Sequence, residues 1–139
     1  MKRILCLDYG EKRIGLALSD PLKIIAYPYK TIINFGLKNL KHEIKKIIAS
    51  ETVESMVIGL PIGLNGKDTI QTQKVREFRL QILDLNIPIY FEDERLSSLA
   101  AAKSMKMEKI KTGFNKGIID KRAAAIILQQ FLDKKKIIK

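Results

Sequence analysis

The order of apolar segments predicts an α/β fold built on a five-stranded mixed sheet, with three antiparallel strands followed by parallel ones and helices on both faces. Two observations predict it. Two β-rich runs, at about residues 3–8 and 13–18, are separated by the turn residues Tyr9-Gly10-Glu11-Lys12, which indicates a hairpin. Later in the chain, helical patterns alternate with short apolar runs, which is typical of parallel strands joined by crossover helices.

The middle of the chain continues this order. A third strand is predicted at about residues 24–32. Residues 37–50 have the three- and four-residue spacing of an amphipathic helix. The continuous apolar run at 55–59 predicts a strand covered on both faces. The apolar positions of the helix are Leu37, Leu40, Ile44, Ile47 and Ile48.

The second half supplies two more crossovers. After a loop at 60–66, Asp68 with Gln71 predicts the capped start of a helix that reaches about residue 83. A fifth strand at 87–91 ends in Glu92-Asp93-Glu94. Ser97 or Ser98 can cap a helix to about 105, before a Lys-rich stretch at 106–116. A last helix at about 118–132 has Asp120 in its first turn and directs these residues to the core: Ile119, Ala123, Ile126, Ile127 and Phe131.

Composition limits the classes of function. The 139 residues fit a single domain, 1–139, and 26 Lys and Arg against 15 Asp and Glu give a net charge of +11. Such a charge indicates a polyanionic partner, nucleic acid first, although a solvated lysine surface would give the same count. The lone Cys6 excludes an internal disulfide, and no run is long enough for a membrane span, so we expect a cytoplasmic protein. The loop from Gly59 to Gly66 lacks the Lys-Ser/Thr ending of an NTPase phosphate loop.

Asp8 is the residue that most directly indicates a site. A carboxylate inside an apolar strand is costly to bury without a partner, so it suggests a metal ion; the alternative is an Asp that only begins a turn. Because open α/β folds build sites at the carboxyl ends of their parallel strands, Asp8, the Gly59 loop and Glu94 are expected to converge.

A series of short segments carries a resemblance to a known family. They are Asp8-Tyr9-Gly10, Lys12-Arg13-Ile14-Gly15, Ser19-Asp20, Gly59-Leu60-Pro61, Asp93-Glu94-Arg95-Leu96 and Lys116-Gly117-Ile118-Ile119-Asp120-Lys121. In this order, from the first strand to the last helix, they resemble the YqgF (RuvX) family. The resemblance implies a ribonuclease H-like fold and the activity of a pre-16S rRNA nuclease or of a Holliday-junction-resolvase-like protein.

The resemblance also implies a site. It would be a metal-dependent phosphodiesterase using Mg²⁺ or Mn²⁺, which prefer oxygen ligands. Asp8 matches the family's first-strand acid, and Asp120 would be the second ligand, although an acid near a helix N-terminus is also stabilised by the helix dipole. Glu94 is the preferred third ligand and Asp93 the alternative; a third reading is an acidic strand end that pairs with Arg95. The fourth strand has no acid at Gly59, where many ribonuclease H-like nucleases carry one.

Substrate contacts follow from charge and position alone. Lys12, Arg13 and Arg95 flank the acids and could hold phosphates. Lys116, with Lys109 and Lys111, could form a clamp, or these lysines could simply be solvated. His42 lies among lysines on the exposed side of its helix and has no expected catalytic role.

The expected function is therefore hydrolysis of phosphodiester bonds in structured nucleic acid, with 5′-end processing of precursor 16S ribosomal RNA favoured. Two alternatives remain open. One is a Holliday junction resolvase acting on branched DNA, which needs paired sites and hence a homodimer rather than a monomer. The other is a noncatalytic RNA-binding protein of ribosome assembly.

Overall fold

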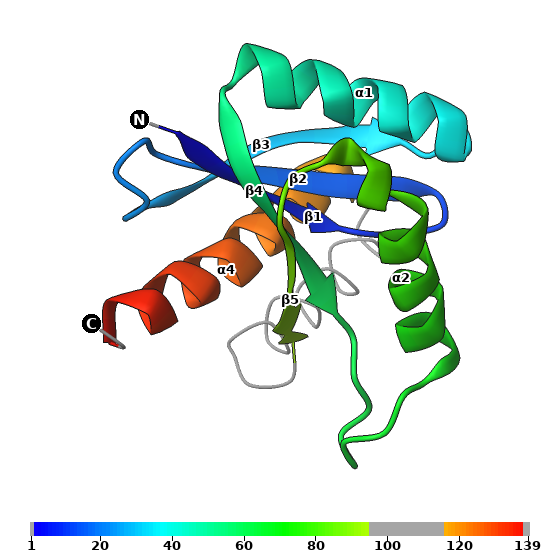
Figure 1. The fold of residues 1–139 in the computed structure, drawn as a ribbon. Coiled ribbons are helices and arrows are strands. Elements are labelled where there is room, and N and C mark those ends of the chain that lie inside the picture. Colours follow the sequence, from blue (N-terminus) through cyan, green and yellow to red (C-terminus); the bar gives the residue numbers. More distant parts are fainter. Residues whose placement is uncertain (1, 95–115, 138–139) are drawn as a thin grey trace.

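The computed structural model describes residues 2–94 and 116–137, and its centre is a five-stranded sheet with strand order β3-β2-β1-β4-β5 (Figure 1). β2 runs antiparallel to both β1 and β3, whereas β1, β4 and β5 are parallel. The predicted mixed sheet is confirmed. The strands are β1 (Arg3–Asp8), β2 (Arg13–Ser19), β3 (Ala26–Ile33), β4 (Val53–Leu60) and β5 (Ile89–Asp93).

Helices cover both faces of the sheet, as predicted. α1 (Leu37–Ser50) and α2 (Ile70–Gln81) pack on one face, and the long α4 (Lys116–Ile137) crosses the other (Figure 1). A short 3₁₀ helix, η1 (Leu83–Leu85), follows α2. Within the described part of the chain, no helix combines the length and the apolarity needed to cross a bilayer.

Strand alternation divides the core into two clusters. Leu5 and Leu7 of β1 pack in the cluster beneath α1 and α2, whereas Ile4 and Cys6 pack in the cluster beneath α4. Because successive side chains of a strand point to opposite faces, Asp8 follows Ile4 and Cys6 onto the α4 face. This alternation determines which acidic side chains lie on the same face of the sheet.

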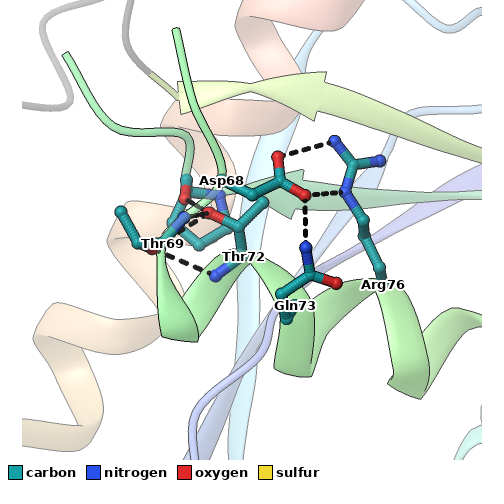
Figure 2. A network of polar contacts seen from close by, with 6 residues as sticks. Asp68, Thr69, Thr72, Gln73 and Arg76 are labelled. Carbon is teal, nitrogen blue, oxygen red and sulfur yellow. Dashed lines mark hydrogen bonds and ion pairs between the residues drawn. The ribbon is translucent and has the colours of Figure 1, made fainter. Parts of the chain in front are cut away.

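α2 begins one residue later than expected from a cap at Asp68. Thr69 is its N-cap: the Thr69 hydroxyl accepts the backbone N–H of Thr72, and the Thr72 hydroxyl accepts the backbone N–H of Thr69. Asp68 instead accepts hydrogen bonds from Gln73 and, at 2.8 and 3.1 Å, from both sides of the Arg76 guanidinium (Figure 2). The predicted Asp68–Gln71 cap is wrong because the neighbouring threonine pair satisfies the end of the helix.

α4 is longer than its apolar pattern predicted, so Asp120 is not in its first turn. The helix begins at Lys116 and continues to Ile137 through Lys134, Lys135 and Lys136. Because lysine is a good helix former, the helix continues beyond residue 132, where the predicted apolar pattern ends. The predicted cap at Ser97 or Ser98, its helix and most of the Lys-rich stretch lie outside the described residues.

Candidate active site

Gly15 brings the main chain of Asp120 close to the end of β1. Asp8, the last residue of β1, is the direct cross-strand partner of Gly15 in β2. The main chain of Asp120 lies against Gly15 so closely that a Cβ on Gly15 would come within 3.0 Å of both the carbonyl oxygen and the carbonyl carbon of Asp120. Since paired residues of antiparallel strands have Cα atoms about 4.5–5.5 Å apart, β1 and α4 meet across this glycine.

Glu94 reaches the same face from the edge strand. A Cβ on Gly59 of β4 would lie 2.5 Å from Oε1 of Glu94 and 2.7 Å from Cδ1 of Ile127 in α4. The Glu94 carboxylate therefore occupies the space that a side chain at position 59 would need, on the face covered by α4. Glu94 is buried, at 8% exposure. At the position where many ribonuclease H-like nucleases carry an acid, this chain has Gly59, and the carboxylate of Glu94 fills the space next to it.

Asp93 belongs to the other face. Its neighbour Glu92 contacts α4 through Gln130 and Lys134, so alternation directs Asp93 away from α4. The sequence could not choose between Asp93 and Glu94 because both faces of the sheet are covered. The packing of α4 puts Glu94, not Asp93, on the face of Asp8 and Asp120.

Negative charges also act on Cys6, which lies on the α4 face of the sheet. Burial is the main reason that the pKa of the Cys6 thiol is raised well above its ordinary value, and the negative charges of Asp8, Glu94 and Glu92 raise it further. Three carboxylates, one in β1, one in β5 and one directly after β5, thus act on one buried sulfur. Cys6 itself is fully buried.

Of the three consecutive acids Glu92, Asp93 and Glu94, it is Glu92 that anchors β5 to α4. It is 4% exposed, accepts a hydrogen bond from Nε2 of Gln130, and pairs with Nζ of Lys134 at 2.8 Å. A buried carboxylate needs such partners. No sequence spacing pointed to Gln130 or Lys134 as partners of Glu92, since they lie on a distant helix.

Arg13, which is expected to hold a phosphate, contacts Asp120 in this structure. Its Nε donates to Oδ2 of Asp120 at 2.7 Å. The Asp120 side chain is 5% exposed and the Arg13 side chain 29%. The pair brings a positive charge into the acidic region from the first residue of β2.

The loop between Asp8 and Arg13 is fixed by contacts with α2 and with the segment that follows β3. Tyr9 stacks on Phe78 of α2 with ring centroids 4.3 Å apart, Glu11 pairs with Lys74, and Asn34 donates to the carbonyl oxygen of Gly10 at 3.1 Å. Gly10 is required because a Cβ there would collide with the carbonyl oxygen of Arg13.

The remaining predicted contacts are divided. Lys12 is exposed beside the acids, and His42 is exposed on α1, across the sheet from them. Lys116 is the first residue of α4, and only its backbone is described. Arg95, Lys109 and Lys111 lie outside the described residues.

The donor set partly fits a divalent cation. Asp8, Glu94 and Asp120 offer carboxylate oxygens, the donors that Mg²⁺ and Mn²⁺ prefer, from one face of the sheet. Among residues 2–94 and 116–137, however, no three His, Cys, Asp or Glu side chains are close enough together to hold an ion. Oδ2 of Asp120 faces Arg13 instead. The carboxylate oxygens are therefore suitable ligands for such an ion. In this structure, however, the positive charge next to Asp120 comes from Arg13.

Comparison with known proteins identifies the family. The model of the RuvX family, described as Holliday junction resolvase, matches residues 2–134. The chain belongs to the RuvX family. This confirms the resemblance found in the sequence.

Curated relatives of this RuvX-family chain are similar over nearly their whole length. A protein of Maridesulfovibrio salexigens is 40% identical over 131 residues, which cover 94% of this chain and 97% of the relative. One from Roseiflexus sp. is 42% identical over 132 residues, covering 94% of each. Both carry the name "Putative pre-16S rRNA nuclease".

Solved structures with the same fold include two resolvases. RuvC of T. thermophilus, in complex with a Holliday junction substrate, has a TM-score of 0.60 at 13% identity and covers 98% of this chain and 96% of its own. The yeast mitochondrial Holliday junction resolvase Ydc2 has a TM-score of 0.55 at 11% identity, covering 94% and 78%. These likenesses confirm the ribonuclease H-like fold of the RuvX-family chain.

Proposed function

We propose that this RuvX-family chain is a metal-dependent nuclease that hydrolyses phosphodiester bonds in structured nucleic acid, and that its task is 5′-end processing of precursor 16S ribosomal RNA in the cytoplasm. The observation that carries the proposal is the position of Asp8, Glu94 and Asp120 on the α4 face, at the carboxyl edge of the parallel strands. Open α/β sheets build their sites at this edge.

The three acids are proposed as the ligands of Mg²⁺ or Mn²⁺. When bound, a pair of such ions activates a water molecule and stabilises the leaving oxygen of the phosphodiester. Asp8, between Gly15 and β4, is the central ligand, and Glu94 and Asp120 approach it from either side. Asp93 has no part in this set because it is directed to the other face.

Positive charge near the acids is proposed to hold the substrate. Lys12 is exposed in the loop that follows Asp8, and Lys116 begins α4 four residues before Asp120. Arg95 directly follows Glu94 in the sequence. With a net charge of +11, the chain attracts phosphates without sequence preference, so specificity must come from the shape of the nucleic acid.

Ribosomal RNA is preferred as substrate because of the relatives. Proteins about 40% identical over nearly the full chain are named for precursor 16S rRNA. At this similarity the acids and the basic surface around them are expected to serve the same class of substrate.

The test compares cleavage by the parent, Asp8→Asn and Asp84→Asn. Asp84 is an exposed acid paired with Lys41 on the opposite face, so its variant is the matched control. With end-labelled precursor rRNA, we expect the parent and Asp84→Asn to cleave with Mn²⁺ and not with EDTA. Asp8→Asn should bind the RNA as tightly as the parent but cleave it at least about 100-fold more slowly, since the central ligand is gone. Equal cleavage by Asp8→Asn would refute the assignment.

Resolution of branched DNA is the second candidate, because the matching family is described as a Holliday junction resolvase. The same acids would serve, but two sites must act together, so the protein should elute as a homodimer with a four-way junction. Gel filtration with and without the junction, followed by cleavage of both substrates, discriminates between RNA and DNA. Binding that weakens with salt, without turnover of either substrate, would instead indicate a noncatalytic ribosome-assembly protein.

A further inference from the structure

We propose that Arg13 is an internal counter-ion of Asp120 that must leave before the acidic centre binds a divalent cation, so that this side chain sets the affinity of the site for metal. The inference rests on the proposed function, since it concerns the same site. It starts from the ion pair that Asp120, one of the proposed ligands, forms with Arg13.

The first step is the burial of the carboxylate. The Asp120 side chain is only 5% exposed, and a charge removed from water in this way needs an opposite charge and hydrogen bonds. Arg13 provides both, because its Nε donates to Oδ2 of Asp120 at 2.7 Å. The guanidinium thus supplies positive charge to an oxygen of a proposed ligand.

The second step is the asymmetry of the pair. The main chain at Asp120 is packed directly on Gly15, so the acid cannot retreat without moving α4 away from β2. Arg13 is different: its side chain is long, is 29% exposed, and starts at the first residue of β2, next to the exposed Lys12. Arginine can therefore swing toward solvent, where it is available to a substrate phosphate, while Asp120 stays in position.

The third step is the conflict between two cations. A guanidinium and a divalent ion would compete for Oδ2 of Asp120 and repel each other at short range, most strongly where water is excluded. Removing the positive charge at position 13 should therefore tighten metal binding. The same change should weaken the metal-free fold, because it leaves the buried carboxylate of Asp120 with less compensation.

The opposite signs of these two effects separate the proposal from other roles. If Arg13 only braced the fold, its loss would lower stability and leave metal affinity unchanged. If it only held phosphate, its loss would weaken substrate binding and leave metal affinity unchanged.

The experiment is calorimetric titration of the parent, Arg13→Gln and Arg3→Gln with Mn²⁺, together with thermal unfolding in EDTA. Arg3 is the matched control: it is the first residue of β1, at the other end of that strand from Asp8, and its Nη1 donates to the carbonyl oxygen of Ser19 at 3.0 Å rather than to a carboxylate. We expect Arg13→Gln to bind Mn²⁺ about tenfold or more tightly than the parent and to unfold at a lower temperature in EDTA. Arg3→Gln should bind Mn²⁺ as the parent does.

A second measurement uses the unaltered protein, so the test survives if Arg13→Gln fails to fold. The Nε–H of Arg13 should give a protected NMR signal in EDTA and lose that protection when Mg²⁺ is added. The Nε–H of Arg76, which is held by the remote Asp68, serves as the reference and should not change.

The outcomes distinguish the two proposals. Tighter binding by Arg13→Gln, including binding seen only in that variant, supports the counter-ion role, as does release of the Arg13 Nε–H by Mg²⁺. If the parent binds Mn²⁺ and Arg13→Gln binds no more tightly, the counter-ion role is wrong while the nuclease proposal stands. If neither protein binds Mn²⁺ and Mg²⁺ leaves the Arg13 signal unchanged, both proposals fail.

Discussion

Gly15 and Asp120 are in backbone contact: the carbonyl group of Asp120 lies where any Cβ on Gly15 would have to be. This contact docks α4 on β2 next to Asp8, the cross-strand partner of Gly15. The position of Asp120, one of the proposed ligands, thus depends on residue 15 of β2 having no side chain.

Gly15→Ala is therefore expected to destabilise the protein and displace Asp120. The clash is with main-chain atoms, which cannot rotate away, so we expect a loss of about 1–3 kcal/mol or more in the free energy of unfolding, measured by urea denaturation. Gly63→Ala is the comparison: a Cβ there would meet its nearest neighbours at 3.0 Å, against 2.1 Å at Gly15, so its loss of stability should be smaller. Equal stability of Gly15→Ala and the parent would show that α4 does not depend on this contact.

Gly59→Ala should affect cleavage more than folding. The atoms that a Cβ at position 59 would meet are the ends of two side chains, Oε1 of Glu94 and Cδ1 of Ile127, which can shift. We expect a smaller loss of stability than for Gly15→Ala, about 1 kcal/mol, but a fall in cleavage of more than about tenfold because Glu94 is pushed aside. Comparing unfolding and cleavage of the two glycine variants tests this, and full activity of Gly59→Ala would argue against Glu94 as a ligand.

Lys134→Met should reveal the cost of leaving Glu92 unpaired. Glu92 is buried and pairs with Lys134 at 2.8 Å, so losing the charge is expected to lower the free energy of unfolding by about 1–3 kcal/mol. Adding Glu92→Gln should recover part of this loss, because the buried charge is then gone. A double-mutant cycle by urea denaturation measures the coupling, and additive effects would mean that the pair contributes nothing.

The network at the start of α2 should respond to acid. Hydrogen bonding by Arg76 is the main cause that lowers the pKa of Asp68 below its ordinary value of 3.8 (Figure 2). A lowered pKa in the folded state means that ionised Asp68 adds stability at pH values above 3.8 and loses that contribution as the pH falls through the lower, folded value. Thermal unfolding of the parent and of Asp68→Asn should therefore differ at pH 6 and converge at the acid end. A difference that stays constant with pH would show that the charge of Asp68 is not involved.

Local patterns in the sequence were sufficient to predict the architecture. The hairpin around Tyr9 and Gly10, the amphipathic α1, and the buried β4 each follow from hydrophobic spacing within a short segment, and the order of segments predicted a mixed sheet with helices on both faces. The family followed from short motifs in the right order, and the matched model confirmed it. Asp8 could also be singled out, because a carboxylate in an apolar strand is conspicuous without any knowledge of the fold.

Only the tertiary structure decided how the acids are arranged. Which of Asp93 and Glu94 lies on the face of Asp8 depends on which face α4 covers, and the sequence of a strand buried on both sides does not indicate this. The contacts of Arg13 and Gly15 with Asp120 join segments more than a hundred residues apart, so no local spacing predicts them. Local propensity determines the elements, whereas contacts between distant elements determine which charges meet, because those contacts form only when the sheet and α4 pack together.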